Sequence, residues 1–313
     1  MDLLEWLLDA DPALRWQVLR DLTDTPAATA AAERARVASE GWGAHLLALR
    51  DPDGQWAGGA CFPAGFTGDL ADGQPWTSTL PSLELLCELG VDPDAAAVRE
   101  SVSLVAQHCR WEHAGQPFFA GEVEACINGR TVRIGAQLGA PVRGVVDRLL
   151  GEQLADGGWN CEAENGSVRS SFDSTLCVLE GLRAFEVAAG GATEVAVARR
   201  RGEEYLLERG LFRRLSTGAV VDEGYLTPSF PTWWHYDVLR ALDHFRAVGE
   251  RPDRRAAEAV ELVRSARRAD GTWPAGPVHR GAVHLALEAG PGSSSRWITL
   301  RALRVLGWYD GGR

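Results

Sequence analysis

The chain has 313 residues, of which 45% are hydrophobic and 24% are charged, and its formal net charge is −11. This is the composition of an ordinary soluble globular protein, and the negative charge argues against nucleic acid and anionic membrane surfaces as partners. The six cysteines form no Cys-x-x-Cys pair, the first residues lack the basic region of a signal peptide, and no stretch holds the roughly 20 apolar residues of a membrane span. We therefore expect reduced thiols, a cytoplasmic location and no stable membrane insertion.

The first forty residues predict two short helices, at 2–8 and 12–22. In the second helix, Leu14, Val18 and Leu22 recur at helical spacing and form one apolar face. This segment differs from the rest of the chain, and we expect residues 1–40 to be N-terminal capping helices for the repeats that follow.

A four-residue pattern, Asp-Gly-x-Trp, occurs three times after residue 40, at 53–56, 156–159 and 270–273. Each copy follows an amphipathic helix, predicted at 45–50, 142–154 and 255–268. The Asp closes a turn, the Gly supplies a backbone conformation that other residues resist, and the Trp offers a large surface for packing between helices. The copies begin 103 and 114 residues apart, about twice the length of a helix-pair repeat, so degenerate copies are expected between them.

Five similar strings each open a mostly apolar helix, at 76–80, 126–130, 172–176, 235–239 and 296–300. Helices with long charged faces lie between them, for example at 195–208. This alternation favours an inner and an outer ring, and strand signals are weak throughout. The sequence therefore predicts an all-α fold, an (α/α) toroid of about five to six helical hairpins. Residues 1–313 are predicted to be one domain, in which 41–313 form the hairpins.

One copy of the pattern, Gln-Leu-Ala-Asp-Gly-Gly-Trp at 153–159, resembles the QW repeat of squalene-hopene cyclases and of the related prenyltransferase β-subunit fold. The chain is also similar to small single-domain bacterial proteins described only as prenyltransferase-like or squalene-cyclase-like. In the cyclases, a Gly-Gly-aromatic turn leads through an acidic-Asn pair to an Asp-x-Asp-Asp-Thr motif that opens an inner helix. Here the turn at 157–159 leads through Glu164 and Asn165 to a matching segment at 171–175.

Within that segment, Asp173 falls on the central aspartate and Thr175 on the threonine, whereas Ser171 and Ser174 replace the flanking aspartates. In class II terpene cyclases the central aspartic acid protonates an alkene or an epoxide, and a carbocation cascade follows. The resemblance thus implies that Asp173 is the general acid of a terpene-cyclase-like enzyme acting on an apolar isoprenoid or a prenyl diphosphate. Such an acid must be neutral at rest, and since its neighbours here are hydroxyls, burial and hydrogen bonds from elsewhere have to keep it protonated. The alternative is that Asp173 is only an N-cap, which contributes about 1 kcal/mol to helix stability.

If the inner helices begin at one rim, the side chains at their tips surround a common mouth. Aromatic faces stabilise cations and pack against isoprenoid chains, and arginines would meet a diphosphate. The predicted substrate-binding residues are Trp76, Trp111, Phe119, Cys126, Asn128, Arg130, Phe172, His235, Tyr236, Arg296 and Trp297. The alternative is that the aromatic residues pack between helices and the arginines pair with acidic residues. Trp56, Trp159 and Trp273 are predicted to serve packing.

Two other functions stay open. The first is a non-catalytic toroid that binds a small apolar molecule. The second is a zinc-type prenyltransferase-like protein, although the Asp-x-Cys pair through which such enzymes bind zinc does not occur in this chain. We therefore expect no metal site and no cofactor, except Mg²⁺ if the substrate carries a diphosphate.

Overall fold

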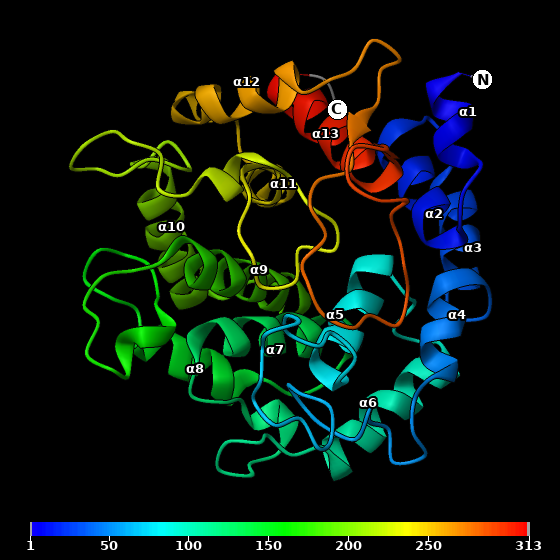
Figure 1. The fold of residues 1–313 in the computed structure, drawn as a ribbon, viewed down its shortest axis with the longest axis vertical. Helices are drawn as coiled ribbons and strands as arrows, with labels where there is room; N and C mark the ends of the chain where they lie inside the picture. Colours follow the sequence, from blue (N-terminus) through cyan, green and yellow to red (C-terminus); the bar gives the residue numbers. More distant parts are fainter. Residues whose placement is uncertain (1, 312–313) are drawn as a thin grey trace.

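The computed structural model describes residues 2–311, and these fold into α-helices arranged around a central axis (Figure 1). The strands assigned within this range are β1 (Trp273–Pro274) and β2 (Ser294–Ser295), a short antiparallel pair. The all-α prediction is thereby confirmed. No helix in residues 2–311 is both long and apolar enough to cross a lipid bilayer.

The inner ring consists of α2 (Pro12–Leu22), α5 (Thr79–Leu89), α7 (Ala125–Leu138), α9 (Phe172–Ala188), α11 (Val238–Val248) and α13 (Arg296–Tyr309). From α5 onward each inner helix packs against the next, and α13 packs against α2. Between α2 and α5 the ring is closed by two hydrogen bonds, from Trp16 Nε1 to the Leu89 carbonyl and from Gln17 Nε2 to the Glu88 carbonyl, both at 3.0 Å. The segment 1–40, predicted to cap the repeats, thus contributes α2 to the inner ring.

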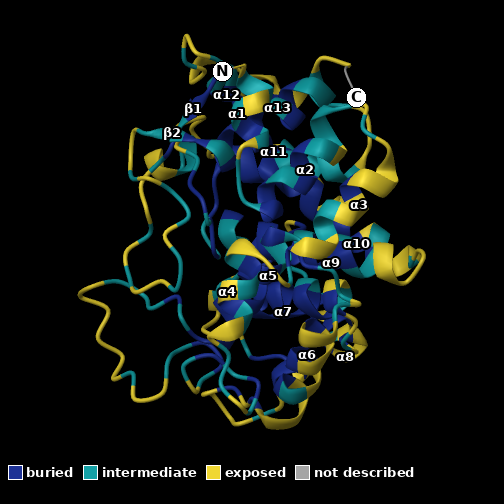
Figure 2. Ribbon diagram, turned by 90° about the vertical axis from the view of Figure 1, so that its right-hand side faces the viewer, coloured by how far each residue is buried: buried dark blue, intermediate teal, exposed yellow. Residues whose placement is uncertain are grey.

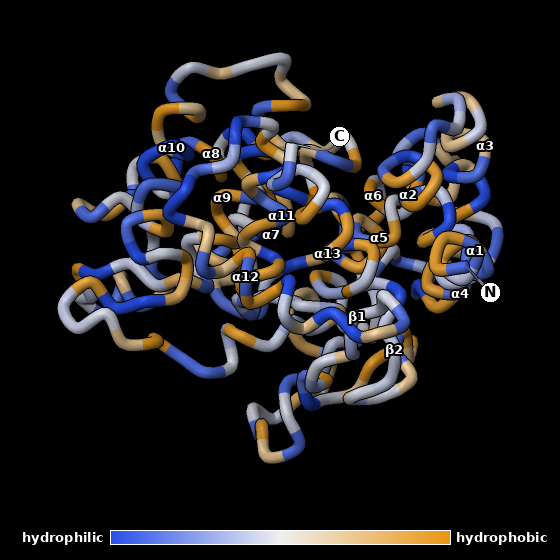
Figure 3. Tube along the Cα trace, turned by 90° about the horizontal axis from the view of Figure 1, so that it is seen from above, coloured by the Kyte–Doolittle hydropathy of each residue, from blue (hydrophilic) through white to orange (hydrophobic). Residues whose placement is uncertain are grey.

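The outer helices are α1 (Leu3–Leu8), α3 (Ala27–Arg36), α4 (Gly41–Ala48), α6 (Ala96–His108), α8 (Arg143–Gly151), α10 (Thr193–Leu207) and α12 (Ala257–Ser265). Single 3₁₀ turns lie in the connections, at η1 (Phe118–Ala120), η2 (Cys161–Ala163), η3 (Glu223–Leu226) and η4 (Arg254–Ala256). Figure 2 shows the inner helices largely buried and the outer ones exposed along one side, and in Figure 3 the hydrophobic positions follow the central helices.

Each of the three Asp-Gly-x-Trp turns joins an outer helix to the next inner helix, and all three make the same contacts. In each copy the Trp indole Nε1 donates to a carbonyl ten residues upstream, that of Leu46, Leu149 or Val263, at 2.6–2.8 Å. In each copy the Trp backbone N–H donates to a threonine Oγ1 of the next inner helix, that of Thr79, Thr175 or Thr299, at 2.9–3.2 Å. All three indoles are almost fully buried, which confirms the predicted packing role of Trp56, Trp159 and Trp273.

Helices α7 and α9 approach each other more closely than the other pairs because two glycines face each other between them. A Cβ on Gly129 would lie 2.5 Å from the Cys177 carbonyl oxygen, and a Cβ on Gly181 would lie 2.3 Å from the Gly129 carbonyl oxygen. Only glycine permits this backbone contact. As a result, the first turns of α7 and α9, with Cys126 and Asp173, lie side by side.

Two long connections fill the mouth of the ring. The segment 227–237 runs into the lumen, where Phe230 stacks on Trp297 with ring centroids 4.3 Å apart and Trp233 stacks on Trp76 at 5.1 Å (Figure 1). The segment 274–293 lies beside it, and His279 stacks on His235 at 3.6 Å. The lumen is consequently not an open channel, and separate pockets lie toward its two ends.

Candidate functional site

A pocket of about 570 Å³ opens at the end of the lumen where α7 and α9 begin. This volume is in the range of small-molecule binding sites, and the lining mixes apolar and aromatic side chains with carboxylates and thiols. The lining residues are Cys61, Phe62, Gln74, Trp111, Glu112, His113, Glu122, Val123, Glu124, Cys126, Ile127, Arg130, Cys161, Ser171, Asp173, Ser174 and Trp234.

Asp173 reaches this pocket from the first turn of α9, and it is not the N-cap of that helix. The N-cap is Ser171, whose Oγ accepts a hydrogen bond from the Ser174 backbone N–H at 3.1 Å. The half-buried Asp173 carboxylate instead accepts one hydrogen bond on each oxygen, from the Tyr225 hydroxyl and from the Tyr236 backbone N–H, both at 2.8 Å. The N-cap alternative for Asp173 is therefore wrong, and the carboxylate is oriented by a segment far from its own helix.

The two tyrosines beside Asp173 are held in their neutral form. Burial, and after it the charge of Asp173, raises the pKa of Tyr225 above its usual value, so its hydroxyl remains a hydrogen-bond donor. Burial also raises the pKa of Tyr236, whose hydroxyl donates to the Leu211 carbonyl at 2.5 Å. Each carboxylate oxygen of Asp173 retains one further acceptor position for a proton or a ligand.

A pair of cysteines lies beside Asp173 in the same pocket. Cys161 Sγ accepts hydrogen bonds from the Cys126 backbone N–H at 3.3 Å and from Ser174 Oγ at 3.2 Å. Hydrogen bonding from Cys126 holds the pKa of the Cys161 thiol below its usual value, whereas the pKa of Cys126 is raised well above it. Cys161 is thus the thiol of this pair that ionises first.

Glu124 joins the two thiols to form a cluster whose ligand atoms all lie within 4.8 Å of one another. Two sulfurs and one carboxylate oxygen are donors that Zn²⁺ accepts, but a structural zinc site needs four ligands. The cluster supplies three.

Glu112 is a functional neighbour that the sequence did not reveal. Its carboxylate accepts the backbone N–H groups of Ala60, Cys61 and Phe62 at 2.9–3.0 Å and so fixes the wall of the pocket that carries Phe62. Glu112 is about fifty positions away from this loop in sequence, and no spacing rule connects the two. Gln74 and Glu122 also line the pocket without a sequence signal, and so does Glu124, two positions before the predicted start of its helix at 126.

Four predicted residues line this pocket, namely Trp111, Cys126, Arg130 and Asp173. Arg130 is almost fully buried and is paired with Glu84, with Nε 3.0 Å from both carboxylate oxygens. Two more predicted residues lie behind the wall: Asn128 exchanges two 2.8 Å hydrogen bonds with the Glu122 backbone, and Phe119 packs edge-on against Phe118.

The remaining predicted residues do not line this pocket. Trp76 and Trp297 are covered by Trp233 and Phe230, and His235 stacks between Trp234 and His279. Phe172 and Tyr236 pack edge-on against each other, and Arg296 donates to the Trp6 carbonyl at 2.9 Å. Helices α5 and α11 begin after their N-caps, Ser78 and Asp237, and so start later than the predicted strings. Three of the predicted residues therefore precede their helices, namely Trp76, His235 and Tyr236.

Comparisons with known proteins find several solved structures to which the chain is similar. No protein-family model and no curated protein sequence matches the chain. The chain is similar to a crystal structure of a protein from Actinoplanes, at 16% identity and a TM-score of 0.44, covering 96% of this chain and 90% of the other. It is also similar to the type II terpene cyclase MstE from Scytonema, at 12% identity and a TM-score of 0.31, covering 88% and 97%. A variant of MstE in complex with its substrate geranylgeranyl dihydroxybenzoate gives 14% identity and a TM-score of 0.30, covering 90% and 97%.

Proposed function

We propose that this chain is a terpene-cyclase-like enzyme of the class II type, in which Asp173 protonates an apolar isoprenoid held in the 570 Å³ pocket. The observation that carries the proposal is the setting of Asp173. Its carboxyl group lines a pocket with Trp111 and Phe62, and it is oriented by Tyr225 and Tyr236 instead of capping its own helix. A carboxylate used only to begin a helix would not need these partners.

The proposed reaction is an isomerisation. The carboxylic acid of Asp173 transfers its proton to the less substituted carbon of a terminal alkene, which leaves a carbocation on the neighbouring carbon. The π electrons of the next alkene attack this cation and form a carbon–carbon bond. The final cation loses a proton to a pocket carboxylate such as Glu122, which releases it to solvent, and solvent restores the proton of Asp173. The ring faces of Trp111 and Phe62 stabilise the intermediate cations.

The proposed step requires a carboxylic acid close to the alkene, and an apolar ligand that fills the pocket displaces water from beside Asp173. No cofactor is proposed apart from Mg²⁺ accompanying a substrate that carries a diphosphate.

The decisive variant is Asp173→Asn, which keeps the shape of the side chain and removes the proton donor. We expect product formation from a panel of prenyl diphosphates and prenylated arenes, followed by mass spectrometry, to fall by about 10²-fold or more. The matched control is Asp94→Asn, which changes an exposed carboxylate in the connection between α5 and α6, outside the pocket. Product formation by a folded Asp173→Asn variant at the wild-type rate would contradict the proposal.

The zinc-type alternative has one observation in its favour, the cluster of Glu124, Cys126 and Cys161. Elemental analysis of the purified protein decides it: about one zinc per chain that is lost in Cys126→Ser favours a metal enzyme. The other alternative is a non-catalytic toroid. It is supported if the protein binds a fluorescent apolar ligand in competition with the substrates of the panel but converts none of them.

A further inference from the structure

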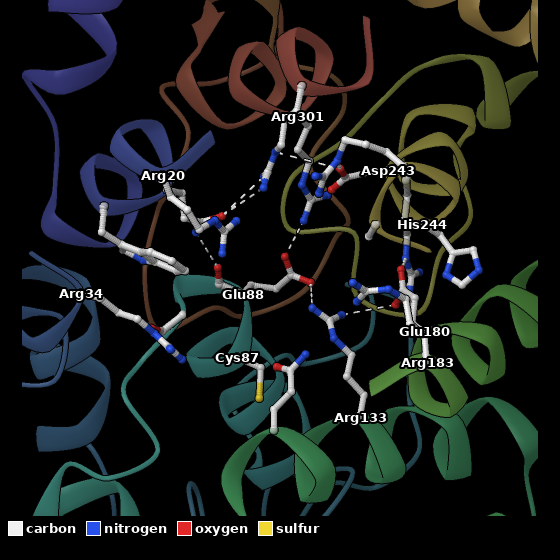
Figure 4. A pocket seen from close by; sticks show the side chains of 18 residues that line it. Arg20, Arg34, Cys87, Glu88, Arg133, Glu180, Arg183, Asp243, His244 and Arg301 are labelled. Carbon is white, nitrogen blue, oxygen red and sulfur yellow. Dashed lines mark hydrogen bonds and ion pairs between the residues drawn. The ribbon is translucent and has the colours of Figure 1, made fainter. Parts of the chain in front are cut away.

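A second pocket, of about 290 Å³, lies inside the ring on the side away from Asp173 (Figure 4). All six inner helices contribute to it, mostly with side chains from their middle and C-terminal turns, and α11 also contributes Arg240 from its first turn. Asp173 and Arg183 both belong to α9, and their separation of ten positions corresponds to about 15 Å along the helix axis. The buried Glu84–Arg130 pair and residues 231–233 occupy the lumen between the two pockets. The second pocket is therefore separate from the proposed catalytic site.

The lining of this pocket is strongly basic in a chain that is acidic as a whole. It contains eight arginines, Arg20, Arg34, Arg133, Arg183, Arg240, Arg246, Arg301 and Arg304. Against them stand three acidic residues, Glu88, Glu180 and Asp243, so the lining has an excess of five positive charges. The net charge of the whole chain is −11. The positive charge is thus concentrated at one place inside the ring.

The acidic residues bind most of these arginines but do not saturate them. Glu88 pairs with Arg133 and Arg301, and Glu180 pairs with Arg240 at 2.8 Å and with Arg133 at 3.3 Å. Figure 4 shows Arg301 and Arg133 approaching Glu88 from opposite sides of the pocket.

Asp243 pairs with Arg246 at 2.7 Å, and a fourth carboxylate, Asp21, bridges Arg20 and Arg304 at 2.6 and 3.0 Å. Six arginines therefore share four carboxylates, which still leaves positive charge without a counterion.

Three groups in the pocket have hydrogen-bonding capacity to spare. Arg183 makes no hydrogen bond and no ion pair with any residue in 2–311. Among the residues that the structure describes, Arg34 donates only to the backbone carbonyls of Gly90 and Val91, at 2.8 and 3.0 Å. Arg304 is 8% exposed, and its buried Nε–H has no hydrogen-bond partner within the described chain. Buried donors without partners and cations without counterions are both unfavourable, and an anion between them would satisfy both.

We propose that this pocket is a binding site for a small multivalent oxyanion of the phosphate class, such as inorganic phosphate or diphosphate. Planar guanidinium groups bind phosphate oxygens through paired N–H donors, which is the arrangement that the converging arginines offer. The volume is sufficient for a small anion, and the charged lining is unsuited to an apolar group such as a prenyl chain. Burial lowers the pKa of Arg34, Arg183 and Arg304, as expected for cations that lack sufficient counter-charge.

The test is a calorimetric titration of the full chain with sodium diphosphate, inorganic phosphate and citrate, each balanced with sodium chloride to one ionic strength. We expect saturable binding of one diphosphate or phosphate per chain and a matching rise in Tm. Arg183→Gln should weaken this binding by about tenfold, because it removes a charged donor. Arg34→Gln is the second variant and should weaken it in the same direction.

Arg200→Gln is the matched control, because it removes one positive charge from an exposed position on α10 outside the pocket. Without anion, Arg183→Gln should unfold at or above the wild-type Tm, since it removes an unpaired cation from a basic pocket. The proposal is overturned if neither phosphate nor diphosphate binds, if only citrate binds, or if Arg183→Gln and Arg34→Gln bind as Arg200→Gln does. Asp173→Asn should bind the anion as the wild type does, so failure of the catalytic proposal does not affect this one.

Discussion

Cys161 differs from the other five thiols of the chain in its pKa, which is lowered where theirs are raised. Ser174 Oγ and the Cys126 N–H both donate to its sulfur, and its pKa is lowered. Cys87 is a suitable comparison, because it is also partly exposed but burial raises its pKa to about 12. The thiolate is the reactive form of cysteine, so these surroundings distinguish two residues that the sequence alone treats alike.

We therefore expect iodoacetamide at pH 8, with a chelator present, to alkylate Cys161 before Cys87. Peptide mass spectrometry at short reaction times measures the order. Ser174→Ala removes one donor to the sulfur and should slow the labelling of Cys161 without changing that of Cys87. Equal rates for the two thiols in the wild type would show that the hydrogen bonds do not activate Cys161.

At the scale of one element, the Asp-Gly-x-Trp turn is a connector with a fixed set of contacts. The indole holds the outer helix and the Trp backbone N–H holds the next inner helix through a threonine hydroxyl. In the third copy, Trp273 N–H donates to Thr299 Oγ1 at 2.9 Å, and both residues are almost fully buried. This copy is far from the candidate site and suits a test of the turn itself.

Thr299→Val keeps the shape of the side chain and leaves the buried Trp273 N–H without an acceptor. We expect the free energy of unfolding, measured with urea, to decrease by about 1–3 kcal/mol. Thr193→Val, at an exposed position in the first turn of α10, is the matched control and should change it by less than about 0.5 kcal/mol. An equal effect of the two substitutions would mean that the Trp–Thr contact does not stabilise the turn.

At the scale of the whole molecule, the two long connections meet at the mouth of the ring through neutral imidazoles. His235 stacks on His279, and Ser229 Oγ lies 3.0 Å from His279 Nε2. Burial, and then the charge of His279, lowers the pKa of His235 to about 3, and burial lowers that of His279 to about 4. In the unfolded chain both groups have pKa values of about 6.5.

The stability of the protein should therefore depend on pH through this contact. Below about pH 6.5 the two histidines bind protons in the unfolded chain but stay neutral in the folded protein. Their contribution to the free energy of unfolding is therefore present above that pH and is lost as the pH falls toward 4. When the pH is lowered from 7 to about 4.5, we expect the free energy of unfolding, measured with urea, to decrease less in His279→Gln than in the wild type.

His113→Gln, at an exposed position, is the control and should follow the wild type. Glu288 acts in the opposite sense: burial raises its pKa to about 7, and its contribution is lost as the pH rises. The comparison between variants removes this effect, because both retain Glu288. Parallel curves for His279→Gln and the wild type would contradict the assignment.

The sequence by itself determined the helical rings. The periodic spacing of apolar residues and the three Asp-Gly-x-Trp turns depend on contacts within one hairpin, and such local patterns are legible along the chain. They located α7, α9 and α13 closely and placed Asp173 in the first turn of α9.

Tertiary structure decided what surrounds that residue. Tyr225 and Tyr236 reach it from more than fifty positions away, Glu112 fixes a wall from about fifty, and the connection at 227–237 covers Trp76 and Trp297. The arginine pocket has the same origin, because its charges are unremarkable on each helix and become a site only when six helices close a ring.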